Sequence, residues 1–173
     1  MLACSARNQV RLWDVKTGRE LSAPVVDEDV THIAFSPDGA LLALAGQEQV
    51  VVHDVKRGEK IAVIADYIGP IAFSQDGLVL ATGGHEDSHV VKLWAANSGR
   101  ELLQVGGALG GATSLAFGPD GEWLYAGTGS SQVVGWKLSE VMDNDVVAKL
   151  RQAGHFETLL QALDAADLAN VLK

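Results

Sequence analysis

The stretch THIAFSPDGALLALAGQEQVVVHDVKRG at residues 31–58 decides the fold that we expect. Short runs of aliphatic and β-branched residues alternate here with clusters of Gly, Asp and Pro, which is typical of β-strands joined by tight turns. Pro37 presets the first central position of a turn, and Gly39 supplies the permissive backbone near its end. The stretch and the residues beside it therefore predict an antiparallel meander with strands at 30–36, 41–46, 49–55 and 60–65.

The same pattern recurs along the chain at an interval of about 40 residues, which is the period of propeller repeats. Three turns of one type keep this phase and contain Asp38-Gly39, Asp76-Gly77 and Asp120-Gly121. These turns lie between four strand-like segments, which start at Val10, Val50, Val91 and Val133. Their fourth residues are Trp13, His53, Trp94 and Trp136, at successive intervals of 40, 41 and 42.

The chain resembles the WD-repeat family over residues 1–138. The resemblance lies in LWD at 12–14, VHD at 52–54, LW at 93–94 and the three AFSPDG-like turns. It implies a mainly β fold made of propeller blades, each a four-stranded sheet whose first strand is innermost. It also implies that Trp13, Trp94 and Trp136 pack between blades.

The family's strand order divides the chain into four blades, two of them incomplete. Residues 30–65 and 68–105 each supply a whole blade, whereas 1–26 lack an inner strand and 112–138 lack an outer one. A blade buries its faces against two neighbours, and a ring closes with about six to eight blades. We therefore expect the chain either to be part of a longer one or to complete its ring as a homo-oligomer, two copies giving eight blades.

The period changes after about Asp143. Apolar residues from Val146 onward recur at three and four residues, which predicts short helices. The string VVAKLRQAGHFETLLQALDAADLANVLK at 146–173 resembles the start of a fasciclin domain, through Gly154 to Phe156 and Ala166 to Leu168. The expected domains are thus blades at 1–138, a linker at 139–145 and this segment. The alternative is a helical cap over a propeller edge.

Charge and composition exclude several classes of function. The net charge of −9 opposes general binding to nucleic acid, which requires clustered basic groups. No apolar run is long enough to insert into a membrane, and Met1 opens a short apolar stretch without the basic start of an export signal, so we expect neither insertion nor a recognisable export route for the chain as given. A single cysteine, Cys4, forms no internal disulfide, and we expect it to be buried. The compartment stays open: cytoplasmic for the chain as given, extracellular or periplasmic if the fasciclin resemblance holds.

Motifs for catalysis are absent from the sequence. The glycine pairs at 106–107 and 110–111 lack the context of a phosphate-binding loop, and no nucleophile elbow is present. We expect no catalytic residues, no cofactor and no enzyme activity. The segment from His85 to His89 contains two imidazoles and two carboxylates, which are ligands for zinc. A polar hairpin turn explains the same residues more simply, so no metal site is predicted.

One end of the blades is predicted to be acidic. In the family's arrangement, the top surface carries the loops between blades and the turns between second and third strands. Because an acidic surface attracts cationic partners, we expect a noncatalytic protein-interaction module that binds a basic peptide or protein patch. Ordinary solubilising loops are the alternative, and an adhesion or matrix protein and a metal enzyme using His85 and His89 are rival functions. The residues predicted for partner binding are Asp27, Glu28, Asp29, Asp66, Tyr67, Glu86 and Asp87.

Overall fold

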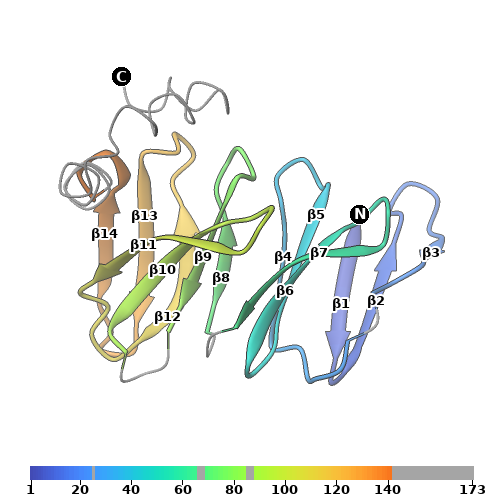
Figure 1. Ribbon diagram of the computed structural model, residues 1–173, viewed down its shortest axis with the longest axis horizontal. Coiled ribbons are helices and arrows are strands. Elements are labelled where there is room, and N and C mark those ends of the chain that lie inside the picture. The colour runs from blue at the N-terminus through green and yellow to red at the C-terminus, as the bar shows by residue number, and fades with distance from the viewer. Residues whose placement is uncertain (25, 66–68, 85–87, 142–173) are drawn as a thin grey trace.

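The computed structural model describes residues 1–24, 26–65, 69–84 and 88–141 of the 173-residue chain. Its strands form four antiparallel sheets, two with three strands and two with four, lying side by side (Figure 1). This arrangement confirms a mainly β fold of four blades, two of them incomplete. Blade 1 contains β1 (Leu2–Ala6), β2 (Gln9–Trp13) and β3 (Glu20–Leu21), and blade 2 contains β4 (His32–Phe35), β5 (Leu41–Ala45), β6 (Gln49–Asp54) and β7 (Glu59–Ala65).

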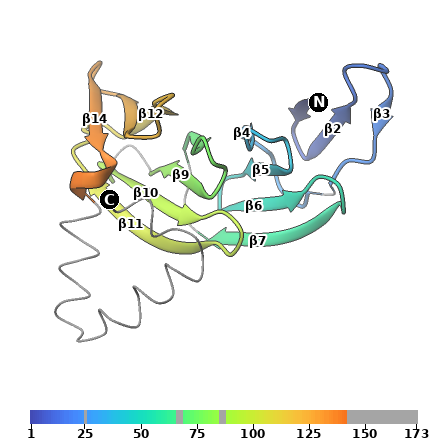
Figure 2. The ribbon, with the colours of Figure 1, turned by 90° about the horizontal axis from the view of Figure 1, so that it is seen from above.

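Blade 3 repeats the four-stranded order of blade 2, whereas blade 4 ends at its third strand. Viewed from above, β4 and β12 lie on one side of a fan of sheets and β7 and β11 on the opposite side (Figure 2). The innermost strands contact one another in sequence, β4 with β8 and β8 with β12. Blade 3 contains β8 (Ile71–Phe73), β9 (Val79–Gly83), β10 (Val90–Ala95) and β11 (Arg100–Gly106), and blade 4 contains β12 (Ala112–Phe117), β13 (Trp123–Thr128) and β14 (Val133–Lys137).

The strand register places the four repeat-marking residues in equivalent slots. Each lies on the strand that corresponds to the third strand of a complete blade, and each is paired with a leucine of the preceding strand. His53, Trp94 and Trp136 are buried. Trp13 is half-buried. The pairs are Leu2 with Trp13, Leu42 with His53, Leu80 with Trp94, and Leu124 with Trp136.

The hydrophobic core is divided into three clusters, one between each pair of successive blades. The first joins Val10 and Leu12 of blade 1 to Leu42 and Leu44 of blade 2. The second packs blade 2 valines and alanines against Leu80 and Trp94, and the third packs Val91 and Leu93 against Leu124 and Trp136. Every blade is therefore stabilised mainly through its neighbours, because each sheet has an apolar face to bury.

The turns between the first and second strands share one chemistry. Asp38 Oδ1 accepts hydrogen bonds from Ser36 Oγ at 2.6 Å and from the Ala40 amide at 2.9 Å. Gly39 has φ of +71°, a conformation that other residues adopt only with strain. Asp76 repeats the arrangement with Ser74 and Leu78, and Asp120 accepts from the Glu122 amide. These turns reverse the chain at the same end of blades 2, 3 and 4.

Backbone hydrogen bonds define the two ends of the blades. At the bottom surface of blades 2, 3 and 4, the chain leaving the third strand bonds to the turn between the first and second strands, as in Val55 N to Ala40 O at 2.9 Å. At the top surface, each loop between blades lies beside a turn between second and third strands. Gly69 N to Gly83 O at 2.8 Å and Gly129 N to Gly111 O at 3.1 Å are examples. The top surface thus brings together loops from neighbouring blades.

A short helical turn at 138–141 follows β14 and includes the first residues of the expected linker. The segment 146–173, with its fasciclin resemblance, lies outside the described residues. Within the described ranges, the chain contains no helix with the length and hydrophobicity needed to cross a membrane.

Candidate functional site

The loop from blade 1 to blade 2 is fixed to the top of blade 2 by one glutamate. Glu28 Oε2 accepts hydrogen bonds from the Gln47 and Glu48 amides at 3.0 and 3.2 Å. Gly46 makes room for this contact, since a Cβ at position 46 would overlap the Glu28 carboxyl group. Asp27 and Asp29 flank the fixed residue, and both are exposed. The loop therefore presents two carboxylates from a position that the sheet holds.

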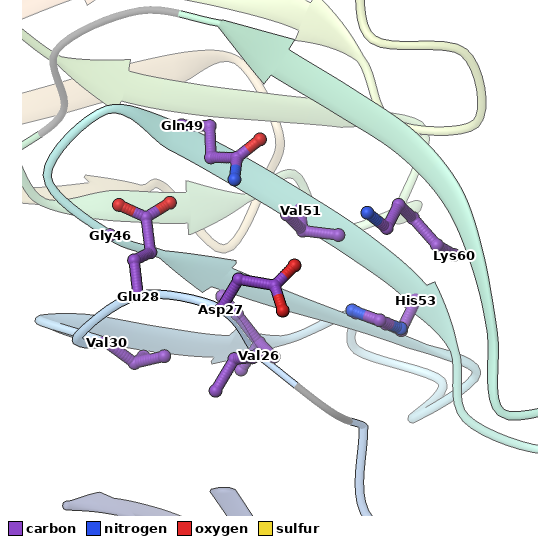
Figure 3. A pocket seen from close by; sticks show the side chains of 10 residues that line it. Val26, Asp27, Glu28, Val30, Gly46, Gln49, Val51, His53 and Lys60 are labelled. Atoms are coloured by element: carbon purple, nitrogen blue, oxygen red, sulfur yellow. The ribbon is translucent and has the colours of Figure 1, made fainter. Parts of the chain in front are cut away.

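Beneath this loop lies a small hollow. It has about 20 Å³ of space for the centre of a water molecule, enough for about one water. In Figure 3 the Asp27 carboxylate and the Lys60 amine point toward the same hollow as the His53 ring. These groups come from the loop, β7 and β6. Its lining residues are Val26, Asp27, Glu28, Val30, Leu44, Gly46, Gln49, Val51, His53 and Lys60.

His53 is 5% exposed, and neither of its ring nitrogens has a hydrogen-bond partner. Burial lowers the pKa of His53, and the positive charge of Lys60 lowers it further. Folding therefore favours the neutral imidazole over the protonated one. A buried imidazole that lacks a hydrogen bond costs free energy.

The equivalent slot in blade 3 shows what blade 2 lacks. Trp94 Nε1 donates a hydrogen bond to Thr82 Oγ1 at 2.9 Å, and both side chains are buried. The register places Leu44 of blade 2 where blade 3 has Thr82. In blade 4, Trp136 Nε1 donates instead to Gly106 O at 2.9 Å. His53 has neither kind of acceptor, and its ring is smaller than indole, which accounts for the hollow.

The predicted partner-binding residues are placed as follows. Asp27 and Asp29 are exposed on the top surface, whereas Glu28 is half-buried and already holds the two amides. Glu48 is exposed beside them. The structure thus brings four acidic residues of two neighbouring loops together. Asp66, Tyr67, Glu86 and Asp87 lie outside the described residues.

The metal hypothesis gains nothing from the described part of the chain. Across residues 1–24, 26–65, 69–84 and 88–141, no group of three or more His, Cys, Asp or Glu side chains is placed to hold an ion. His89 Nδ1 accepts a hydrogen bond from the Gly110 amide at 3.0 Å, so it braces the loop that leads into blade 4. His85 lies outside the described residues.

The expectation that Cys4 is buried is wrong, because its side chain is exposed. It occupies the slot of Thr82, on the face of blade 1 that points away from blade 2. The thiol would be covered only by a sheet packed on that face.

Sequence reasoning missed Gly46, Lys60 and the hollow around His53. A signal for the hollow was available, because an imidazole replaces the indole of the other repeats while Leu44 replaces a threonine. Gly46 and Glu28 are 18 residues apart and follow no period. Their partnership therefore left no sequence signal.

Comparisons with known proteins agree with this architecture. The model of the WD domain, G-beta repeat family matches residues 17–54 and 100–137. The chain is 23% identical to the apoptotic protease-activating factor 1 of Mus musculus over 95% of its own length, and spans 15% of that protein. The crystal structure of the computationally designed Ika4 protein is similar with a TM-score of 0.65 and 20% identity, over 78% of this chain and 83% of that one.

The family match lies within the blades and does not extend to the C-terminal segment. The family match ends at residue 137, so it gives no support to the fasciclin resemblance of residues 146–173. The likeness to Ika4 shows the fold alone. The WD-domain model therefore matches two segments, 17–54 and 100–137, within a set of four antiparallel sheets arranged as propeller blades.

Proposed function

We propose that this chain is a noncatalytic protein-interaction module whose top surface binds a basic peptide or a basic patch of a protein. WD40 repeats support a role in protein interaction. The observation that carries the proposal is the fixed loop, in which Glu28 is bound to blade 2 and holds Asp27 and Asp29 in place. Rigid presentation lowers the entropic cost of binding a partner.

The charge of the site favours a cationic ligand. Asp27, Asp29 and Glu48 are exposed carboxylate side chains on neighbouring loops, and the chain as a whole carries a net charge of −9. Such a field accelerates association with positively charged partners. We propose that Asp66, Tyr67, Glu86 and Asp87 extend this surface, with Tyr67 as an aromatic anchor. A second copy of the chain is the other proposed partner, through the terminal blades.

The test measures binding of a fluorescent lysine-rich peptide by anisotropy. We expect the substitutions D27N and D29N together to weaken binding several-fold, and doubled ionic strength to weaken binding of the unaltered chain. The matched control E101Q with E122Q also removes two exposed carboxylates, but from β11 and the bottom surface. Binding that is independent of salt, or an equal loss in the control, would contradict the proposal.

The rival functions find no favouring observation in the described residues. The adhesion function depends on residues 146–173, and the metal-enzyme function depends on pairing His85 with His89. The first lies wholly and the second partly outside the described chain. The interaction module is therefore the function that we propose.

A further inference from the structure

The three contacts between blades use the same two kinds of sheet face. We call the face toward the preceding blade the N-face and the face toward the following blade the C-face. On the N-faces of blades 2, 3 and 4, one slot holds Leu42, Leu80 or Leu124, each 0% exposed. On the C-faces of blades 1, 2 and 3, another slot holds Val10, Val50 or Val91, at most 7% exposed. Burial of these slots is thus the rule between blades.

The two terminal blades carry the same slots uncovered. Leu2 fills the leucine slot on the N-face of blade 1 and is 57% exposed. Val133 fills the valine slot on the C-face of blade 4 and is 77% exposed. It is paired with Gly127, just as Val91 of blade 3 is paired with Gly83. The chain therefore displays one N-face and one C-face, which are the two halves of an interface that it forms three times internally.

The N-face of blade 1 is built like a face that packs. In blade 3, which packs on blade 2, Lys92 Nζ lies 5.7 Å from the centre of the Trp94 ring. In blade 1, the Arg11 guanidinium lies 5.5 Å from the centre of the Trp13 ring, and Glu20 holds it at 2.7 and 3.0 Å. Blades 1 and 3 thus carry a leucine, a cationic side chain and a tryptophan at equivalent positions of their N-faces. A cation over the indole is thus compatible with a buried blade contact.

The C-face of blade 4 carries Val133 and two aromatic rings, and its residues are rearranged relative to the other blades. Tyr125 replaces the alanine found at this slot in blades 2 and 3, and Gly135 replaces the leucine found in blade 3. The Tyr125 ring lies across Gly135, where a Cβ would come within 3.0 Å of the ring. Trp123 stacks beside it, with ring centres 6.0 Å apart and an angle of 11°. Large and small residues have exchanged places, and the face remains suited to packing.

We propose that two copies of this chain associate head to tail, the C-face of blade 4 of each copy packing on the N-face of blade 1 of the other. Both contacts are of the kind that the blades already make, and a heterologous contact repeated around a closed rotation gives a ring. The ring has eight blades, within the usual size of propellers. The inference rests on the blade arrangement of the proposed function but does not require the basic ligand.

The single native cysteine provides a probe of this contact. Cys4 lies on the N-face of blade 1 beside Leu2 and is exposed in one chain. The experiment combines light scattering with the rate of thiol labelling across a concentration series of the full chain. At high concentration we expect twice the mass of 18.2 kDa and slow labelling, and on dilution the single mass and fast labelling. A chain that keeps the single mass, or labels equally fast in the double-mass form, would overturn the proposal.

Charged substitutions locate the contact. V133E places a carboxylate on the C-face of blade 4 and should weaken association at least about tenfold, because the valine is buried there. V15E is the matched control, since Val15 is 66% exposed in the turn at the bottom of blade 1, away from both faces. Circular dichroism establishes that both variants fold. Equal association by V133E and V15E would contradict the assigned face.

Mixing two variants tests the head-to-tail geometry. L2E damages the N-face of blade 1, and V133E damages the C-face of blade 4. In a mixture, the intact C-face of L2E meets the intact N-face of V133E, so we expect mixed pairs to form where each variant alone stays single. Absence of mixed pairs, or masses beyond two chains, would refute the closed head-to-tail ring. Peptide binding by the single V133E chain separately tests the proposed function.

Discussion

The indole of Trp94 and the hydroxyl of Thr82 are joined by a buried hydrogen bond of 2.9 Å between adjacent strands of blade 3. The same slot is occupied differently in each blade, by Cys4, Leu44 and Ala126 in place of the threonine. The blades therefore share a backbone plan but differ in the hydrogen bonding of the ring opposite this strand: the indoles of Trp94 and Trp136 are hydrogen-bonded, whereas the imidazole of His53 is not. Those differences make stability measurements informative.

The hydrogen bond itself is tested by a double-mutant cycle. We expect W94F and T82V each to lower the free energy of unfolding, and the coupling between them to be about 1 kcal/mol. Urea denaturation gives the four values. Purely additive effects would mean that the 2.9 Å contact contributes nothing to stability.

The buried imidazole makes stability depend on pH. Burial and Lys60 lower the pKa of His53 in the folded protein, whereas in the unfolded chain this histidine takes up a proton near pH 6.5. The contribution of the neutral His53 to the free energy of unfolding is thus fully present above about pH 6.5 and is lost as the pH falls below this value. The free energy of unfolding should fall by up to about 1.4 kcal/mol per pH unit there.

The reference for this measurement is H53Q, which retains a polar side chain but does not titrate. The difference in unfolding free energy between the two proteins should change between pH 7.5 and 5.5, values chosen to lie about one unit either side of the unfolded pKa. Two parallel pH profiles would show that His53 has the same pKa folded and unfolded.

Rebuilding the slot of blade 3 in blade 2 tests the origin of the hollow. In the H53W background, L44T supplies a hydroxyl acceptor in the position of Thr82, and L44V supplies the same shape without it. We expect the threonine variant to be more stable by about 1 kcal/mol in thermal or urea unfolding. If valine is the better residue, the new indole is not directed toward position 44.

The Glu28 anchor predicts strong non-additivity with Gly46. G46A should lower the free energy of unfolding by about 1–3 kcal/mol, because the new methyl group displaces the carboxylate. In the E28A background the same substitution meets no carboxylate and should cost much less. Calorimetric or urea unfolding of the four proteins decides this, and equal costs of G46A in both backgrounds would contradict the anchor.

Local chemistry explains why the strands could be predicted closely. The expected strands at 41–46, 49–55 and 60–65 correspond to Leu41–Ala45, Gln49–Asp54 and Glu59–Ala65. Alternating aliphatic residues and turns such as Asp38-Gly39 act within a few residues, so the sequence alone reveals them.

Features that depend on contacts between blades could not be predicted in the same way. Cys4 has a sequence environment typical of a core strand, yet its exposure depends on whether a sheet covers blade 1. The contact of Glu28 with Gly46 joins a loop to a turn of the next blade, and neither segment by itself contains a pattern that predicts the contact. The acidic loop residues were recognisable, but their fixation to the sheet was not.

The division of the core between successive blades has a consequence for unfolding. Among the described residues, no core cluster joins blade 1 to blade 3 or blade 2 to blade 4, so each sheet relies on the ones beside it. Opening should thus spread inward from the margins, as in other proteins with nearest-neighbour coupling. The two-residue strand β3, with both side chains exposed, would exchange its amide hydrogens first, and the central strands β5 and β9 last.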